Sequence, residues 1–532
     1  MQFGARLCVL LAAALPAAAA EFRSISENAA VLFDAPSLKA KKTYVIGRGY
    51  PVEIIVAVEG WYKIRDAGGD LAWVEAKSLS ERRTLMVKVK LADGKARSIL
   101  VDRDSAWIDI YDDVAGYGPG PSLHWTPDHA KFIWVTERDG WRHAWLVDRS
   151  GKMDLITMGN FDVMKVVLTD IVGGWLYYYA SPTNGTQMFL WRTRLDGTGE
   201  PQRLTPAGAR GMHDYDVSPR GGWAIHTATA WGTPATTDLV RLPSHQVVRT
   251  LVTNEALKAT LAGLRQGKSE FFQVDIGNGV ALDGWMMFPP DFDATKKYPV
   301  LFHVYGEPAS QTVTDSYGGS NWLWHLMLTQ QGYIVASVDQ RGTPAPKGRA
   351  WRKAVLNQIG KLRVEEQSAA AKIIGRRPYV DSTRMGVWGW SGGGSSTLHL
   401  MFRANDVYKM GMAVAPVPDV HNYDTIYQER YVGLPQTDSA AYVDASPIYF
   451  AQGLKGDLLV VHGSGDDNVH YQGTEQLINR LIRLNKPFQM MEYPNRTHGI
   501  FEGTNTRTHL YNLLTRYLNE HLPAGPRSTT VP

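Results

Sequence analysis

The stretch Arg384–Ala404, RMGVWGWSGGGSSTLHLMFRA, decides the fold of the second half of the chain. An apolar run ends in a serine, Ser391, that stands among glycines, and a segment of helical character follows. The pentapeptide GWSGG fits the Gly-x-Ser-x-Gly nucleophile elbow, whose strained strand-to-helix turn needs small neighbours and exposes the serine hydroxyl. Glycine-rich sequence also produces this pentapeptide by chance, but here the preceding strand and the following helix supply the context that the elbow requires.

The elbow makes a second prediction, because the acid and the histidine of such a site follow the serine in that order, each after a later strand. The segment LLVVHGSGDDNVH ends a strand in a loop that carries Asp466 and Asp467, and MMEYPNRTHGIF ends the next strand in a loop that carries His498. The histidine would take the serine proton, and the acid would orient the imidazole. We therefore predict a catalytic triad of Ser391, Asp466 and His498.

Two hydrogen-bond donors are also needed for the oxyanion that forms during acyl transfer. The backbone N–H of Gly392, directly after the serine, is one candidate. The second is the phenolic hydroxyl of Tyr305, in the loop HVYGEP after an early strand. We predict an oxyanion hole made of Tyr305 and Gly392.

The segment from 266 to 525 alternates buried-type strands with helical segments, which predicts an α/β fold with a doubly wound, mostly parallel sheet. A short tail, 526–532, follows. Residues 83–265 instead show a repeat of roughly 45 residues with aromatic strands and Asp-Gly type turns, which is typical of propeller blades. Three clear repeats and a partial one (Leu85–Val101) predict an incomplete β-propeller, since closed propellers usually have at least four blades.

The N-terminal residues 1–20 have the pattern of a signal peptide, with a basic residue, an apolar stretch and small residues before Glu21. The only cysteine, Cys8, lies in this segment, so the mature chain would have no disulfide, thiolate metal site or catalytic cysteine. We expect an exported protein, periplasmic or secreted. Residues 21–82 then show short alternating strands that predict a small β-barrel.

Composition excludes several classes of function. The formal net charge is only +4 on 532 residues, which gives no support for nucleic-acid binding. No later apolar run approaches the ~20 residues of a membrane-spanning helix. The triad also implies no metal and no cofactor.

With these residues in view, the chain resembles the prolyl oligopeptidase superfamily, in its bacterial dipeptidyl peptidase IV-like branch. The motifs that carry the resemblance are VYGEP, DQRGTPAPKGRAW, GWSGGGSST, APVPDVHNYDTIYQERYVGLP, HGSGDDNVH and THG. The resemblance implies the same triad, Tyr305 in the oxyanion hole, and Asn468 as a contact to a substrate carbonyl. The small barrel resembles a bacterial Src-homology-3-like domain through Gly60-Trp61 and Trp73-Val74; such domains bind peptides or cell wall, or act as spacers.

The same resemblance implies a proline-type S1 pocket lined by Val417, Tyr423, Tyr427 and Val469. A flat apolar slot suits a rigid pyrrolidine ring. Ordinary core packing of the two tyrosines is the alternative. Tyr423 and Tyr427 are four residues apart, so they would share one face if their segment is helical.

Three features depart from the family pattern. Gly392 and Val420 stand where many relatives carry an aromatic residue. Glu307 stands where glycine is common, and it would either contact a substrate amine or be solvated. The acidic pair by which dipeptidyl peptidases hold the substrate's free N-terminus would lie upstream of ERDGWRHAW, and this chain has no equivalent there.

The sequence therefore predicts an exported serine peptidase that prefers proline or alanine at P1 and acts on peptide substrates. An esterase or broad acyl hydrolase is one alternative, because the triad does not choose amide over ester. A weakly active protein that binds cell wall or peptides is another. Exposed blade edges would also be a liability in a monomer, so a homodimer is a further hypothesis.

Overall fold

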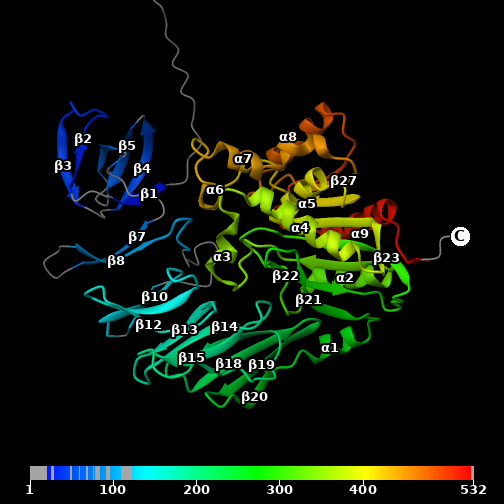
Figure 1. Cartoon of the computed structure of the whole chain (residues 1–532), viewed down its shortest axis with the longest axis horizontal. Helices are drawn as coiled ribbons and strands as arrows, with labels where there is room; N and C mark the ends of the chain where they lie inside the picture. The colour runs from blue at the N-terminus through cyan, green and yellow to red at the C-terminus, as the bar shows by residue number, and fades with distance from the viewer. Residues whose placement is uncertain are drawn as a thin grey trace, which may run out of the picture. The chain divides into compact units, whose positions relative to one another are not determined.

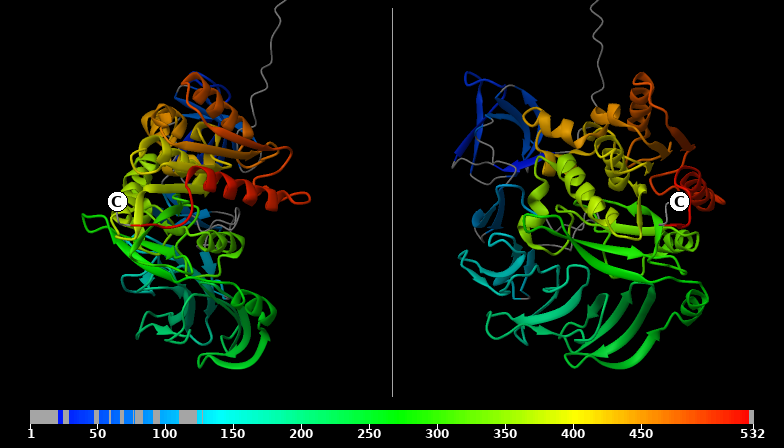
Figure 2. Two further views of the ribbon diagram at one scale, coloured as in Figure 1. Left: turned by 90° about the vertical axis from the view of Figure 1, so that its right-hand side faces the viewer. Right: turned by 45° about the vertical axis from the view of Figure 1, so that its right-hand side comes forward.

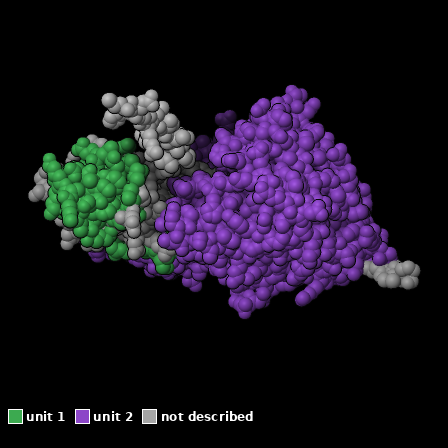
Figure 3. All heavy atoms as spheres, turned by 90° about the horizontal axis from the view of Figure 1, so that it is seen from above, with its two compact units in different colours: residues 1–108 green, residues 109–532 purple. Residues whose placement is uncertain are grey.

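The computed structural model describes most of the chain, namely residues 21–24, 29–47, 51–58, 60–66, 70–75, 77, 84–90, 96–109, 123–126 and 128–528. It divides into two compact units, residues 1–108 and 109–532, which are coloured separately in Figure 3. The predicted signal peptide, residues 1–20, lies outside the described residues.

The first unit is built of antiparallel strands. Six of them form one sheet in the order β1-β4-β5-β6-β2-β3: β1 (Glu21–Ser24), β2 (Ala29–Phe33), β3 (Lys42–Gly47), β4 (Pro51–Val58), β5 (Trp61–Asp66) and β6 (Leu71–Glu75). Alternate residues such as Leu32, Ile64 and Val74 are fully buried in its core. The expected partial blade corresponds to a separate two-stranded pair in this unit, β7 (Thr84–Lys90) and β8 (Ala96–Arg103).

The second unit begins with three four-stranded antiparallel sheets, which follow one another from cyan to green in Figure 1. They comprise β9 (Leu123–Trp125), β10 (Lys131–Thr136), β11 (His143–Asp148) and β12 (Met153–Leu155); β13 (Lys165–Asp170), β14 (Trp175–Ala180), β15 (Phe189–Arg194) and β16 (Gln202–Arg203); and β17 (Met212–Val217), β18 (Trp223–Ala230), β19 (Thr233–Arg241) and β20 (Gln246–Val252). Apolar side chains pack the first sheet against the second and the second against the third. The prediction of three propeller blades is confirmed.

After a short helix, α1 (Glu255–Ala262), the chain forms the large sheet, in the order β21-β22-β24-β23-β25-β26-β27-β28. Its strands are β21 (Ser269–Asp275), β22 (Ala281–Met287), β23 (Lys296–His303), β24 (Ile334–Val338), β25 (Val380–Trp390), β26 (Met410–Val414), β27 (Asp457–Gly463) and β28 (Gln489–Tyr493), with β29 (Arg527–Ser528) pairing β23. The first two strands are antiparallel additions, and β24 to β28 run parallel. The predicted mostly parallel sheet is confirmed.

Helices cover both faces of this sheet (Figure 1 and Figure 2). They are α2 (Gly319–Gln330), α3 (Gly348–Arg352) with the 3-10 turn η3 (Lys353–Val355), α4 (Ile359–Gly375), α5 (Gly392–Arg403), η4 (Val420–Asn422), α6 (Thr425–Val432), α7 (Ser439–Ala445), η5 (Pro447–Gly453), α8 (Tyr471–Arg483) and α9 (Thr506–His521). One apolar core joins the sheet to α4, α5 and α8, and another joins it to α2 and α9. This is the doubly wound arrangement that the sequence predicted. In the described part of the chain no helix is long and apolar enough to cross a membrane.

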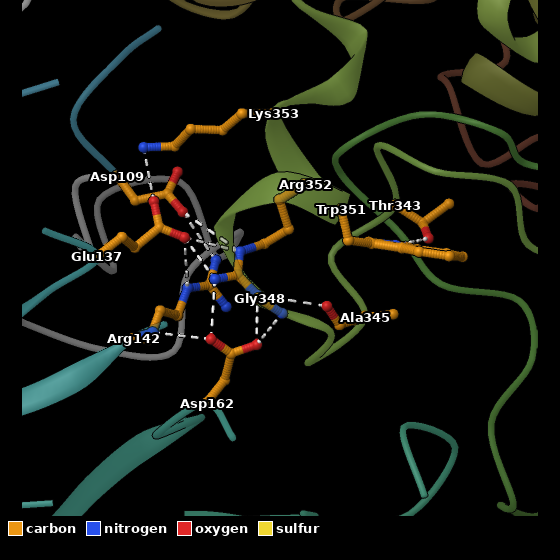
Figure 4. A network of polar contacts seen from close by, with 10 residues as sticks. All are labelled: Asp109, Glu137, Arg142, Asp162, Thr343, Ala345, Gly348, Trp351, Arg352 and Lys353. Carbon is orange, nitrogen blue, oxygen red and sulfur yellow. Dashed lines mark hydrogen bonds and ion pairs between the residues drawn. The ribbon is translucent and has the colours of Figure 1, made fainter. Parts of the chain in front are cut away.

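A cluster of buried charges joins the first blade to α3 and η3 (Figure 4). Among the residues that the structure describes, it contains three acids and three bases: Asp109, Glu137, Asp162, Arg142, Arg352 and Lys353. Arg352 lies at its centre, with Nη1 2.6 Å from Asp162 Oδ2 and Nε donating to Glu137 Oε1 at 2.9 Å. Lys353 Nζ is 2.6 Å from the other oxygen of Glu137.

The charges of this cluster balance, which is the condition for burying them. Burial would raise the pKa of Asp162, but Arg352 and Arg142 hold it below its ordinary value. Asp162 also accepts the backbone N–H of Gly348 at 2.7 Å, at the start of α3. The cluster therefore fixes the first blade to the α/β domain by directional contacts that an apolar interface would not provide.

The third blade contains a second buried polar group, made of imidazoles. His213 Nε2 donates to the carbonyl of Arg210 at 3.0 Å, so its Nδ1 is free to accept from His226 Nε2 at 2.9 Å. Burial lowers the pKa of His213 to about 4 and that of His226 to about 3. Both rings are therefore neutral in the folded state at neutral pH.

We predict that acidification from pH 7 to pH 5 destabilises this blade. Below about pH 6.5 the unfolded chain binds protons that the folded imidazoles reject, so stability falls by about 1.4 kcal/mol per pH unit for each such histidine until their folded pKa values are reached. His226→Gln keeps a donor for His213 but does not titrate, so its unfolding midpoint should fall less between pH 7 and pH 5 than that of the parent. His470→Gln, at an exposed position, is the control; an identical pH dependence in all three proteins would contradict this account.

Candidate active site

Ser391 stands at the sharp turn between β25 and α5, with φ 59° and ψ −122°. A positive φ is strained for a residue with a side chain, and the surrounding glycines make the turn feasible. A Cβ at Gly393 would lie 2.2 Å from the carbonyl oxygen of Val304, and one at Gly394 would lie 2.6 Å from that of Val414. The GWSGG pattern therefore reflects close contact between backbones, as the elbow requires.

The predicted acid and base meet beside this turn. His498 Nδ1 is 2.7 Å from Asp466 Oδ2. The other carboxylate oxygen, Oδ1, accepts the backbone N–H groups of Asn468 at 3.0 Å and Val469 at 2.8 Å. Burial would raise the pKa of Asp466, but hydrogen bonds from His462 and His498 outweigh it and hold the carboxyl well below its ordinary pKa. Asp466 therefore stays ionised, as a residue that stabilises an imidazolium must.

The serine and the histidine come from adjacent loops. Trp390, the residue before the nucleophile, donates its indole N–H to the carbonyl of His498 at 2.9 Å. Among the described residues the Ser391 hydroxyl makes no hydrogen bond with the His498 ring. Catalytic hydrogen bonds are often long without substrate and shorten in the complex, so the arrangement is compatible with a serine–histidine pair.

The main chains of both predicted oxyanion residues adjoin α5, the helix that follows Ser391. Gly392 is the first residue of α5, so its backbone N–H has no partner within the helix and lies at the positive end of the helix dipole. The main chain of Tyr305 is held against the same helix, because Ser396 Oγ donates to its carbonyl at 2.7 Å. Both elements can thus present donors to one developing charge.

The predicted substrate-binding residues lie in loops and in α6, near this turn. Val417 and Val469 are buried. Tyr423 donates its hydroxyl to Asn468 Oδ1 at 2.8 Å, and its ring meets that of Tyr427 edge-on with centroids 5.7 Å apart. The two tyrosines do not share a helix face, however: α6 begins at Thr425, and Tyr423 is an extended residue before it.

The interpretation of Glu307 as a solvated residue is wrong. Only 12% of its side chain is exposed, Oε1 pairs with Arg363 Nη2 at 2.9 Å, and Oε2 accepts the hydroxyl of Tyr427 at 3.0 Å. A Cβ at Gly392 would lie 2.8 Å from the Glu307 carboxyl. The two unusual residues are therefore linked, because the Glu307 side chain occupies the space that a side chain at position 392 would need.

Two further residues support the site: Arg363, which was not predicted, and His462, whose place close to the end of a strand indicated a structural histidine. Arg363, on α4, is 2% exposed and lies between Glu307 and Ser396. His462, at the end of β27, is fully buried and directs Nε2 toward Asp466 Oδ2 at 3.1 Å. No local sequence signal marks Arg363, because its partners come from loops distant in sequence; the proximity of His462 to the acid was the only available indication.

We predict that Asp466→Asn lowers kcat by roughly 10⁴ while the protein stays folded, because an amide at this place presents an N–H group to donors and no longer stabilises the imidazolium. The neighbouring acid, Asp467, is exposed, and Asp467→Asn should leave turnover of an activated acyl substrate within a factor of about two to three, as a surface change away from the site. Steady-state kinetics of both variants check this. The opposite ranking would assign the acid to the second aspartate.

Comparison with protein families gives three matches. Residues 320–524 match the prolyl oligopeptidase family, residues 61–235 match the dipeptidyl peptidase IV (DPP IV) N-terminal region, and residues 26–81 match the bacterial SH3 domain. The first match lies within the predicted α/β segment and the third within the predicted barrel, whereas the second begins inside the barrel segment and extends over most of the predicted propeller.

Among curated proteins, a probable dipeptidyl-aminopeptidase B of Uncinocarpus reesii is 32% identical over 479 residues, which are 85% of this chain and 49% of the relative. A probable dipeptidyl peptidase 4 of Aspergillus fumigatus is 29% identical over 88% of this chain and 61% of its own length. The chain thus spans between 49% and 61% of the length of these two relatives.

Among solved structures, dipeptidyl peptidase 4 of Porphyromonas gingivalis aligns with 94% of this chain and 73% of its own, with a TM-score of 0.77 and 29% identity. A putative dipeptidyl aminopeptidase IV from Bacteroides ovatus has a TM-score of 0.73 over 94% of this chain and 75% of its own, and at 22% identity it shows the shared fold. Together with the family matches, these similarities show that the chain belongs to the prolyl oligopeptidase family of serine peptidases, with a DPP IV N-terminal region and a bacterial SH3 domain before the catalytic segment.

Proposed function

We propose that this chain is an exported serine peptidase that hydrolyses peptide bonds through an acyl-enzyme, with a preference for proline or alanine at P1. The observation that carries the proposal is the apolar wall of Val417, Val469 and the two edge-on tyrosine rings next to the Asp466–His498 pair. Such a wall accepts a small, flat side chain.

The proposed mechanism uses the predicted triad and the predicted oxyanion donors. Ser391 Oγ attacks the scissile carbonyl while His498 takes its proton, and Asp466 stabilises the imidazolium. The N–H of Gly392 and the hydroxyl of Tyr305 stabilise the oxyanion. His498 then protonates the leaving amine, and a water molecule activated by the same histidine hydrolyses the acyl-serine.

We further propose that cleavage does not require a free N-terminus. The buried acids that the first blade directs toward the α/β domain, among them Glu137 and Asp162, are already paired with Arg352 and Lys353 (Figure 4). A substrate ammonium would have to displace these buried cations, which is costly. In the described part of the chain this cluster therefore provides no uncompensated charge for a substrate amine.

Export is proposed from residues 1–20, and with it a periplasmic or secreted location. A homodimer, and a contact of the N-terminal barrel with cell wall or peptides, remain proposals from the sequence pattern. Mass spectrometry of the protein recovered from its native host checks export: we expect a mature chain that starts at Glu21. A chain that retains residues 1–20 would contradict export by this signal.

The substrate prediction is tested with chromogenic amides. We expect kcat/KM for Gly-Pro and Ala-Ala amides to exceed that for a Gly-Phe amide by at least about tenfold, the discrimination that a small apolar pocket provides. N-blocked Gly-Pro amide should be cleaved within about tenfold of the free-amine form, since one ammonium–carboxylate contact is worth about that much. Turnover of the free-amine form alone would contradict the absence of an anchor and indicate a dipeptidyl mode.

Ser391→Ala is the control for every substrate and should abolish turnover. A matched p-nitrophenyl ester separates the alternatives: hydrolysis of the ester without hydrolysis of any amide would indicate an esterase. If neither amide nor ester is hydrolysed and Ser391→Ala is indistinguishable from the parent, the result would indicate a binding protein instead.

A further inference from the structure

A buried carboxylate lies directly beside the predicted oxyanion hole. The position that a Cβ would take at Gly392 is 2.8 Å from both Cδ and Oε2 of Glu307 and 3.1 Å from its Cγ. Real Cβ atoms do not approach other atoms so closely, so a side chain at 392 and the carboxylate of Glu307 exclude each other. The space next to Ser391 that a side chain at position 392 would need is occupied by the side chain of Glu307.

This carboxylate is rigidly held. Arg363 pairs with Oε1, donates Nε to the carbonyl of Ile359 at 3.0 Å and donates Nη1 to Ser396 Oγ at 3.1 Å. Ser396 in turn donates to the carbonyl of Tyr305. The guanidinium thus fixes Glu307 to the loop of the predicted oxyanion tyrosine, and its charge offsets a negative charge that would otherwise disfavour the oxyanion.

The carboxylate also retains acceptor capacity. An ionised carboxylate can accept about four hydrogen bonds, and among the described side chains it accepts from Arg363 and from Tyr427. Oε2 is the oxygen nearest to Gly392 and the one that the Tyr427 hydroxyl reaches. Since Tyr427 is one of the predicted S1 residues, Oε2 lies at the boundary between the S1 wall and the turn that carries Ser391.

We propose that Glu307 determines P1 specificity, as a polar element in an otherwise apolar S1 pocket that accepts a hydrogen bond from a hydroxyl on the P1 side chain. Within the class of small P1 residues that the proposed function favours, proline and alanine themselves included, a hydroxylated residue such as 4-hydroxyproline or serine is then cleaved faster than its hydrocarbon counterpart. The inference rests on the proposed peptidase function. A neutral donor suits the site better than a cation, because Arg363 already balances the charge of Glu307.

The test compares kcat/KM for two pairs of chromogenic amides, Gly-Hyp against Gly-Pro and Gly-Ser against Gly-Ala. In the parent protein the hydroxylated member of each pair should be preferred by about tenfold, the contribution of one hydrogen bond to a charged acceptor. Glu307→Gln keeps the size of the side chain and an acceptor for Arg363 but removes the charge, and it should bring both ratios to about one. Glu365→Gln, at the surface of α4, is the matched control and should keep the parent ratios.

A single and a double variant test whether side chains at positions 392 and 307 compete for the same space. Gly392→Tyr should lose activity because its ring has no space beside Glu307, and Glu307→Gly in the same chain should restore activity with a preference for Gly-Pro over Gly-Hyp. Glu307→Gly leaves the buried Arg363 without its partner, so unfolding midpoints are measured alongside. If this variant does not fold, Glu307→Gln still decides the question.

Three results would overturn the inference: parent ratios of one or below, ratios unchanged in Glu307→Gln, or a loss in Glu307→Gln that affects only substrates with a free amine. In each case the amides are still cleaved in a Ser391-dependent manner, so the proposed peptidase function stands. If no amide is cleaved, the proposed function itself fails, and the inference with it.

Discussion

The close contact of backbones around Ser391 is the constraint on which the rest of the site depends. The first turn of α5 touches the ends of β23 and β26, so closely that Gly393 and Gly394 cannot carry side chains. This contact holds Ser391 at a positive φ and leaves the N–H of Gly392 at the end of the helix. Gly392, which precedes these two glycines, has no side chain either, and there the space is occupied by the Glu307 side chain.

Placing an acid beside an oxyanion hole opposes catalysis unless its charge is compensated. Arg363 provides the compensation from α4, and its own remaining donors are satisfied by Ile359 and Ser396. The same principle holds in the blade contact of Figure 4, where three acids face three bases. In these two places buried acids are balanced by buried bases, an arrangement that contributes geometry and specificity rather than large net stability.

Features with local or ordered signals could be predicted from the sequence. The pattern of a strand, glycines around a serine and a helix indicated the nucleophile elbow. The required chain order of serine, acid and histidine indicated the loops that would carry the acid and His498. Features that depend on contacts between distant segments could not. The helix near Tyr423 begins two residues later than the shared-face argument needs, because Asp424 caps it by accepting the N–H of Tyr427. The burial of Glu307 depends on Arg363, which is 56 positions away on a different element.

The pairing of buried acids with buried bases connects the shortened propeller with the altered pocket. In this chain the blade acids nearest the α/β domain are used to fix the blade to α3 and η3. If the substrate's N-terminus is not bound, as we propose, selectivity must come from the residues around the scissile bond. Glu307 is placed for this role, since it contacts an S1 tyrosine on one side and approaches the turn of the nucleophile on the other. The loss of blades would thus leave P1 recognition as the main source of specificity.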